Sequence, residues 1–410
     1  MPASLQQSST HSKANRSECG ARAVFSSASK ECVVYFGQTP GQGTGSPINM
    51  LRHLRRFTDA GWDVLVVSEW GKPVTLYSME GWQVYDLPYR RCWWPPYRPD
   101  SKLLRDARVT LWAKECRRAF SDRKPHAIVT YLSYHSELMS EIAAQYSIEA
   151  NIPLTVIVYD DAMAFDNGVA PDERKQADKR FRWILQQARQ NWFVSGQLAE
   201  AYGFSPDPSR VLMPIPEGIC KQVVWRAEFS GRPVLIYAGF IYDQQYPLLR
   251  RLGQAIEKAG GQFLILSQET PNVRKLCAES TILFRRLLPT NREALEFVGK
   301  HAAGFVAAYS DRIDDMPWTR SSFPSKVVEF GHLGLPILLV SPPECAVYTW
   351  SQERNLPFNL RPEELGRVVE FVTALKDPVQ WEALAKPIRS LALTEFNPDV
   401  IQERLVKHLV

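Results

Sequence analysis

Near the C-terminal end of the chain, a lysine and a glutamate stand three residues apart in the run Pro324-Ser325-Lys326-Val327-Val328-Glu329-Phe330. Proline suits the first turn of a helix, where its missing N–H costs nothing, so the run predicts a helix that carries Lys326 and Glu329 on one face. Unpaired N–H groups at a helix start favour anions. We therefore expect a phosphate beside Ser325 and Lys326, and hydrogen bonds from sugar hydroxyls to Glu329.

An exposed ion pair at helix spacing is the simpler alternative for Lys326 and Glu329. Their context favours a nucleotide site instead. The apolar run 304–308 predicts a buried strand, a polar loop follows it, and a second apolar run at 337–340 predicts the next strand. Strand, loop, helix and strand form a βαβ unit, whose ligands gather at the carboxyl ends of the strands. Ser310, which follows an expected strand, and Gly239, which ends another, are further binding candidates.

Two adjacent aspartates, Asp160 and Asp161, directly follow the apolar run 154–159. Neighbouring side chains of an extended chain point to opposite sides, so only one of the two is expected to face a cleft. A carboxylate there can accept a proton from a hydroxyl or stabilise an oxocarbenium-like centre; a helix N-cap is the alternative role. His135 also follows an expected strand and is a third catalytic candidate, with a structural histidine as its alternative.

A glycine-rich loop, residues 38–47, follows the first expected strand and includes Gly43, Thr44 and Gly45. Glycine permits positive φ and a close approach of the backbone to a ligand, so the loop is a further candidate for binding. A surface turn is the alternative. The spacing does not match the G-x-G-x-x-G dinucleotide pattern, and no Walker lysine follows.

The chain has 410 residues, of which 45% are hydrophobic and 11% aromatic, as expected for two globular domains. It contains no run of 18 or more apolar residues, and residues 1–30 are polar and Ser-rich, unlike a signal peptide. We expect a cytoplasmic protein with a disordered tail over residues 1–30.

Seven cysteines are scattered along the chain and never form a C-x-x-C pair, so the sequence indicates neither a disulfide framework nor a zinc cage. No histidine lies near a suitable Asp or Cys for a metal pair. We expect reduced thiols, no bound metal and no cofactor.

The net charge of +5 conceals one basic window, residues 90–124, which holds eleven Lys or Arg against four Asp or Glu. Tryptophans and a tyrosine lie among the cations of residues 90–108. Aromatic and basic side chains suit the surface of an anionic membrane, which we expect this segment to contact. Solvated charge is the plain alternative, and without a nucleic-acid-binding motif we expect no nucleic-acid partner.

Apolar runs and helical periods alternate along the chain. Strands are expected at 32–36, 63–68, 127–131, 154–159, 192–195, 233–239, 263–266, 282–284, 304–308 and 337–340. Helices are expected at 47–60, 136–146, 172–190, 247–259 and 291–300, besides the one with Lys326. Two prolines and a glycine interrupt residues 213–218, where we place a boundary between two doubly wound α/β domains.

Together these features resemble the GT-B glycosyltransferases, in particular the group-1, family 4-like branch. The resemblance extends from about residue 31 onward, and its most specific part is Pro324-x-Lys326-x-x-Glu329-Phe330 with Gly334-x-Pro336. It implies two Rossmann-like domains facing a central cleft: an acceptor-side domain at 31–215, a nucleotide-sugar-binding domain at 216–385, and a C-terminal helix at 386–410 that returns to the first domain. It also implies that Lys326 contacts the donor diphosphate and Glu329 the ribose.

The chain departs from this family at two places. Many relatives have a second glutamate eight positions before the ribose-binding one, where this chain has Ser321. They also place an arginine and a lysine after the glycine that ends the first strand of the second domain, whereas Phe240 and Ile241 follow Gly239 here.

The resemblance implies an enzyme that transfers a sugar from a nucleotide-sugar donor to a hydroxyl of a glycan or a lipid-linked acceptor, without a metal, in the cytoplasm or at the inner face of the membrane. The missing basic pair supports an alternative, a partner subunit that binds nucleotide or glycan without catalysis. A nucleotide-sugar epimerase on the same fold is the third possibility.

Overall fold

The N-terminal half of the chain contains one sheet of six parallel strands in the order β3-β2-β1-β4-β5-β6. The computed structural model describes residues 31–41, 45–68, 80–87, 102–164, 170–218 and 221–409. Every residue of β1, β4 and β5 is buried, which explains their continuous apolar runs, since helices cover both faces of a parallel sheet. The strands are β1 (Cys32–Gly37), β2 (Asp63–Ser68), β3 (Gln83–Asp86), β4 (Ala127–Tyr131), β5 (Leu154–Val158) and β6 (Gln190–Phe193).

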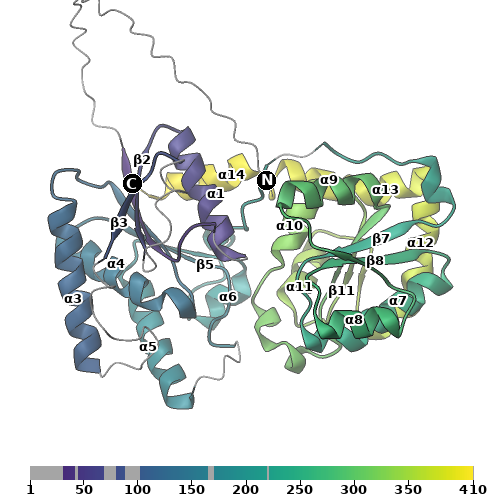
Figure 1. Cartoon of the computed structure of the whole chain (residues 1–410), viewed down its shortest axis with the longest axis horizontal. Coiled ribbons are helices and arrows are strands. Elements are labelled where there is room, and N and C mark those ends of the chain that lie inside the picture. Colours follow the sequence, from purple (N-terminus) through teal and green to yellow (C-terminus); the bar gives the residue numbers. More distant parts are fainter. Residues whose placement is uncertain are drawn as a thin grey trace, which may run out of the picture. The chain divides into compact units, whose positions relative to one another are not determined.

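Helix α1 (Ser46–Asp59) leads from the glycine loop back across this sheet. Gly45 precedes it with φ 69°, a left-handed conformation that favours glycine, and Met50, Leu54 and Phe57 are buried on one stripe. The other helices of this half are α3 (Lys102–Ala119), α4 (Glu137–Ala150), α5 (Pro171–Gln187) and α6 (Gly196–Ala201), with short 3₁₀ turns η2 (Tyr134–Ser136) and η3 (Pro208–Arg210). Helix α4 packs between α3 and α5 (Figure 1).

The C-terminal half repeats this topology in a second sheet of six parallel strands, ordered β12-β11-β10-β7-β8-β9. In both sheets the chain starts at a central strand, winds outward to one edge, and then returns to wind toward the other. The order reverses between β1 and β4 and again between β7 and β10, and ligands of such sheets bind beyond the carboxyl ends of the strands at this switch point. The strands are β7 (Val234–Ala238), β8 (Gln262–Ser267), β9 (Leu283–Arg286), β10 (Gly304–Ala308), β11 (Ile337–Val340) and β12 (Asn359–Leu360).

Helices cover both faces of the second sheet; α7 and α8 lie on one side and α9 and α13 on the other (Figure 1). The helices are α7 (Tyr246–Lys258), α8 (Pro271–Ala278), α9 (Asn291–His301), α10 (Ser325–Gly331), α11 (Ala346–Glu353), α12 (Val368–Lys376), α13 (Pro378–Leu393) and α14 (Pro398–Lys407). Single 3₁₀ turns complete this half: η4 (Ala227–Ser230), η5 (Asp243–Gln245), η6 (Ile313–Asp315), η7 (Pro317–Arg320) and η8 (Pro362–Arg367).

The last helix, α14, contacts the N-terminal half. Gln402 Oε1 lies 2.7 Å from Nδ1 of the fully buried His53 in α1, and His53 Nε2 lies 3.1 Å from the Tyr159 hydroxyl at the end of β5. Because burial lowers the pKa of His53 to about 4, the imidazole is neutral at physiological pH. A neutral ring can donate to Gln402 through Nδ1 and accept from Tyr159 through Nε2.

The alternation of strands and helices predicted from the sequence is confirmed, with the following differences. Pro324 is the N-cap of α10 rather than a residue of its first turn. The helix expected at 172–190 ends at Gln187, because the edge strand β6 starts at Gln190. Part of the basic window forms the helix α3, which the sequence did not predict. The short elements β3, β12, α6, α8 and α11 were not predicted either. The domain boundaries at 215/216 and 385/386 stay predictions.

Candidate functional site

Lys326 crosses the end of the central strand β7 in the second sheet. Its Nζ donates to the Tyr237 hydroxyl and to the Phe240 carbonyl, each at 3.0 Å, and lies 4.6 Å from the centre of the Tyr237 ring. Gly239, with φ 122°, makes room for it, since a Cβ there would lie 2.1 Å from Lys326 Cε. The predicted pair Gly239 and Lys326 is thus brought together at the switch point, where a cation can receive a phosphate.

The two other predicted phosphate-side residues are placed differently. Ser325 is the first residue of α10 and is half-buried. Ser310, after β10, is fully buried and donates a 2.7 Å hydrogen bond to the Arg312 carbonyl. The Ser310 hydroxyl therefore stabilises the loop after β10.

Glu329, three residues beyond Lys326, contacts an entirely different set of groups. Its Oε1 accepts from Asn291 Nδ2 at 2.5 Å and from the Glu217 backbone N–H at 3.3 Å, and its Oε2 accepts from Arg52 Nη1 at 2.7 Å. The residue is only 9% exposed. The alternative of an exposed Lys326–Glu329 ion pair is wrong, because the two side chains bind separate partners.

Asp160 faces the end of β4 and the start of α1, at the switch point of the first sheet. Its Oδ2 accepts from the Tyr131 hydroxyl at 3.1 Å, and the Ser46 hydroxyl lies 2.6 Å from the Tyr131 oxygen and 3.4 Å from the same Oδ2. Asp160 Oδ1 has no protein partner among the residues that the structure describes. We call Ser46, Tyr131 and Asp160 the Asp160 cluster. One carboxylate oxygen is thus oriented and the other is available.

Asp161 turns the opposite way, as its position next to Asp160 predicts, and binds the backbone. Its Oδ1 accepts from the N–H groups of Met163 and Ala164, each at 3.1 Å, and its Oδ2 accepts from the Ser321 hydroxyl at 3.1 Å. Ser321 stands where the resemblance would place a glutamate, and here its hydroxyl anchors Asp161. The geometry favours the capping role for Asp161 and leaves Asp160 as the candidate base.

Two opposing influences act on the Asp160 carboxyl. Burial raises its pKa above the ordinary value, and the hydrogen bonds from Tyr131 and Ser46 oppose that rise. Burial also raises the pKa of Tyr242 and the pKa of Tyr309, and the negative charge of Asp160 adds to both increases. These two tyrosines follow β7 and β10, so Asp160 acts electrostatically on groups at the switch point of the second sheet.

The remaining predicted residues are less well defined. His135 lies in the 3₁₀ turn η2 after β4, and its side chain is outside the described part of the structure. Gly43 and Thr44 also lie outside the described residues. Gly45 immediately precedes α1 and its carbonyl accepts from the N–H groups of Ile48 and Asn49, so the loop ends in the turn that presents Ser46.

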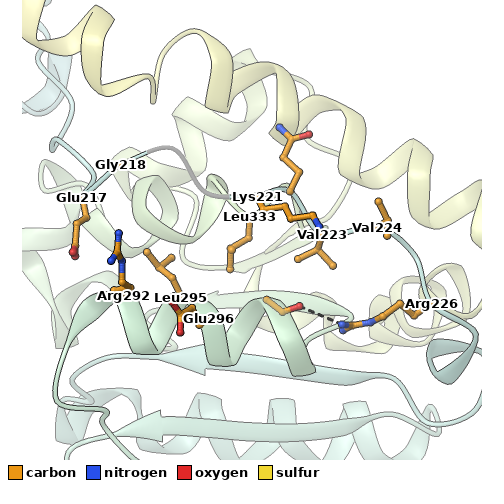
Figure 2. Close-up of a pocket in the computed structure, with 12 residues that line it drawn as sticks. Glu217, Gly218, Lys221, Val223, Val224, Arg226, Arg292, Leu295, Glu296 and Leu333 are labelled. Carbon is orange, nitrogen blue, oxygen red and sulfur yellow. Dashed lines mark hydrogen bonds between the residues drawn. The ribbon is translucent and has the colours of Figure 1, made fainter.

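A cavity of about 560 Å³ lies beside α9 and the connection between the two sheets. Figure 2 shows Glu217 and Arg292 at one end of it and Val224 and Arg226 toward the other. The cavity contains none of the residues predicted from the sequence, although the backbone of Glu217 binds Glu329. It therefore adjoins the Glu329 contacts without including Lys326 or Asp160.

Within the ranges that the structure describes, no group of three or more His, Cys, Asp or Glu residues is arranged to hold a metal ion. No helix there is both long and apolar enough to cross a membrane. The described cysteines Cys32, Cys116, Cys277 and Cys345 are free thiols.

Four side chains that contact Asp160 or Glu329 are not among the candidates predicted from the sequence: Ser46, Arg52, Tyr131 and Asn291. Ser46 and Tyr131 carried a detectable signal, since both stand at the carboxyl side of an expected strand. Asn291 begins an expected helix. Arg52 is one of several cations along α1, and no local pattern distinguishes it from its neighbours.

No protein-family model and no curated protein matches the chain. Solved structures do match it. Anabaena Alr3699/HepE in complex with UDP and glucose is 13% identical, with a TM-score of 0.62 over 92% of this chain and 99% of its own. A glycosyltransferase from Rickettsia africae is 9% identical, with a TM-score of 0.63 over 92% and 97%. A protein named as a UDP-N-acetylglucosamine 2-epimerase from Listeria monocytogenes is 10% identical, with a TM-score of 0.53 over 93% and 96%.

These identities are low, so the matches bear on architecture. The matches extend over 92% of this chain and nearly the whole length of each solved structure, so they include both sheets. The predicted fold class is therefore confirmed: the chain has the GT-B fold, with two doubly wound α/β halves.

Proposed function

We propose that the chain is a glycosyltransferase that moves a sugar from a nucleotide-sugar donor to a hydroxyl of a glycan or glycolipid acceptor. The observation that carries the proposal is the pairing of two sites: a cation, Lys326, at the switch point of one sheet and an available carboxylate oxygen, Asp160 Oδ1, at the switch point of the other. The resemblance of the Lys326 and Glu329 motif to the group-1 branch supports the same assignment.

Each group has a role in this proposal. Lys326 binds the donor phosphate, and Glu329 accepts a hydrogen bond from the ribose. Asp160 Oδ1 takes the proton of the acceptor hydroxyl, while the oxygen of that hydroxyl forms a bond to the anomeric carbon of the donor sugar. The bond from the anomeric carbon to the phosphate oxygen breaks, and the nucleotide leaves with the electron pair. Lys326 stabilises the negative charge that develops on the leaving phosphate.

The Anabaena protein, which shares the fold of this chain, has been solved in complex with UDP and glucose and in complex with UDP-glucose. For this chain we propose a nucleotide sugar of unspecified base and sugar, and we propose that Lys326, rather than a metal, neutralises the leaving group. Addition of EDTA should then leave turnover unchanged, and a loss of activity restored by a divalent cation would contradict the metal-independent form.

A panel of nucleotide sugars tests the enzyme class. Purified protein should release free nucleotide from one donor, and only when an acceptor-containing extract is present. Release of a sugar epimer without an acceptor would indicate the epimerase that the Listeria match suggests. Nucleotide binding without any turnover would indicate a non-catalytic partner subunit, which the absence of a basic pair after Gly239 supports.

We further propose that the acceptor is lipid-linked and that residues 90–108 rest on an anionic membrane surface. Most of this segment lies outside the described residues. Of its cations, Arg105 is paired within the protein, 2.6 Å from Glu141 and 3.5 Å from Glu137, so it adds little free charge. Sedimentation with anionic liposomes should show binding at low salt that is lost at high salt. Binding that survives joint replacement of Trp93, Trp94 and Arg98 would rule out this role.

A further inference from the structure

Arg52 of α1 reaches from the N-terminal half of the chain to Glu329 in the C-terminal half. Its Nη1 donates to Glu329 Oε2 at 2.7 Å and to the Ile215 carbonyl at 2.8 Å. The side chains of Arg52 and Glu329 are only 10% and 11% exposed. A second carboxylate oxygen, Glu217 Oε2, lies 3.6 Å from Arg52 Nη2, but the Glu217 side chain is 43% exposed. Glu329 is therefore the better shielded partner.

The contacts of Glu329 leave limited room for a ligand. A carboxylate has about four positions at which it accepts hydrogen bonds. Asn291 and the Glu217 backbone use two of them on Oε1, and Arg52 uses one on Oε2. One position on Oε2 remains. With these contacts in place, Glu329 can accept one ribose hydroxyl, through Oε2.

Arg52 also fixes the direction in which Glu329 Oε2 points. A carboxylate that is mostly removed from water is costly unless a charged partner compensates it. A carboxylate rotated away from this direction would be a poor acceptor for a ribose hydroxyl. Arg52 Nη1 donates to Glu329 Oε2 and also to the Ile215 carbonyl. Because the second bond anchors the guanidinium, the first one holds Oε2 in a defined direction.

We propose that Arg52 is the positioning residue for Glu329, so that both halves of the chain build the ribose end of the donor site. The inference rests on the proposed function, because it assumes that Glu329 meets a ribose. It adds that nucleotide binding depends on a residue of α1, the helix that also carries Ser46 of the Asp160 cluster. Donor binding and the placement of the candidate base thus share one structural element.

Ribose discrimination provides the test, because a purely structural residue would weaken all nucleotides alike. UDP, GDP and ADP are titrated by calorimetry, and the one that binds is compared with its 2′-deoxy and 3′-deoxy counterparts. A hydrogen bond to a charged group corresponds to roughly ten- to a hundredfold in affinity. The wild type should therefore bind one deoxy nucleotide about ten- to a hundredfold more weakly than the ribonucleotide, and the other almost as tightly as the ribonucleotide. In Arg52→Ala the ratio between the affinities for the ribonucleotide and for that deoxy nucleotide should fall below about threefold, as in Glu329→Ala.

Two further variants make the result decisive. Arg52→Lys keeps the charge but not the planar guanidinium, and it should recover part of the discrimination even if Arg52→Ala is unstable. Arg55→Ala, on the same helix but paired with Glu80, should keep full discrimination. Unchanged discrimination in folded Arg52→Ala and Arg52→Lys, or tighter binding by either, would overturn this inference alone. Failure of the wild type to bind any of the three nucleotides would overturn the proposed function with it.

Discussion

Asp160 is a half-buried carboxylate and Glu329 a buried one, and their surroundings differ. Among the residues that the structure describes, only one oxygen of Asp160 accepts hydrogen bonds, from two neutral hydroxyl groups, and burial raises the pKa of this carboxyl. Glu329 has partners on both oxygens, one of them a guanidinium. The difference separates two functional roles, because a carboxylate that is to exchange a proton keeps a free oxygen, whereas one that is to position a ligand is itself held in position.

The largest effect is expected from Asp160→Asn, which removes the candidate base without changing its size. Turnover should fall by roughly a hundred- to ten-thousandfold, while donor affinity stays within about twofold, as for loss of a transition-state interaction. Single-turnover kinetics and calorimetry measure the two quantities.

Asp161→Asn is the matched control for this experiment. It retains an oxygen that can cap Met163 and Ala164, so it should be milder. Full turnover in both single variants and in the double variant would remove the pair from the mechanism and leave His135 as the candidate.

Glu329→Ala should affect binding rather than the chemical step. Loss of a hydrogen bond to a charged group predicts a nucleotide affinity lower by about ten- to a hundredfold. Glu363→Ala, an exposed carboxylate in the same half with 64% side-chain exposure, serves as the control and should bind normally. If a folded Glu329→Ala bound nucleotide as tightly as the wild type, Glu329 would be a structural residue and the comparison with Asp160 would lose its meaning.

Gly239→Ala should weaken nucleotide binding by about tenfold through Lys326, which the new Cβ would displace. The effect should match that of Lys326→Ala, and the double variant should be no weaker than either single one. Gly366→Ala has nothing within 4 Å of its added Cβ and controls for the substitution itself. Additive losses in the double variant would show that Gly239 acts independently of Lys326.

The smallest effect is a shift in pH dependence for Tyr131→Phe. The Tyr131 hydrogen bond lowers the pKa of Asp160, so its removal lets burial raise that pKa further. A base must be ionised to accept a proton, so the activity that is lost as the pH falls should be lost at a higher pH. Ser46→Ala should move the acid limb of kcat in the same direction by less, since its contact with Oδ2 is longer. An acid limb that stays in place in both variants would mean that Asp160 is not the titrating group.

Much of the fold could be predicted from the sequence, because strands and helices repeat over short distances. The runs at 63–68, 127–131, 304–308 and 337–340 matched β2, β4, β10 and β11 residue for residue, since buried strands require continuous apolar side chains. Elements without that signal were less well predicted: three of the four residues of β9 are exposed, and α3 has no clear apolar face.

For the candidate site, the sequence determined local relations: Lys326 and Glu329 three residues apart, and Asp160 and Asp161 on opposite sides of the backbone. It did not determine their partners. Arg52 and Glu329 are separated by 277 positions, and Ser46 and Asp160 by 114, so only the packing of whole elements brings them together. Whether a carboxylate has a free oxygen depends on donors that arrive from elsewhere in the chain. That is why the tertiary structure alone could distinguish Asp160 from Asp161 and show Glu329 already held by Arg52.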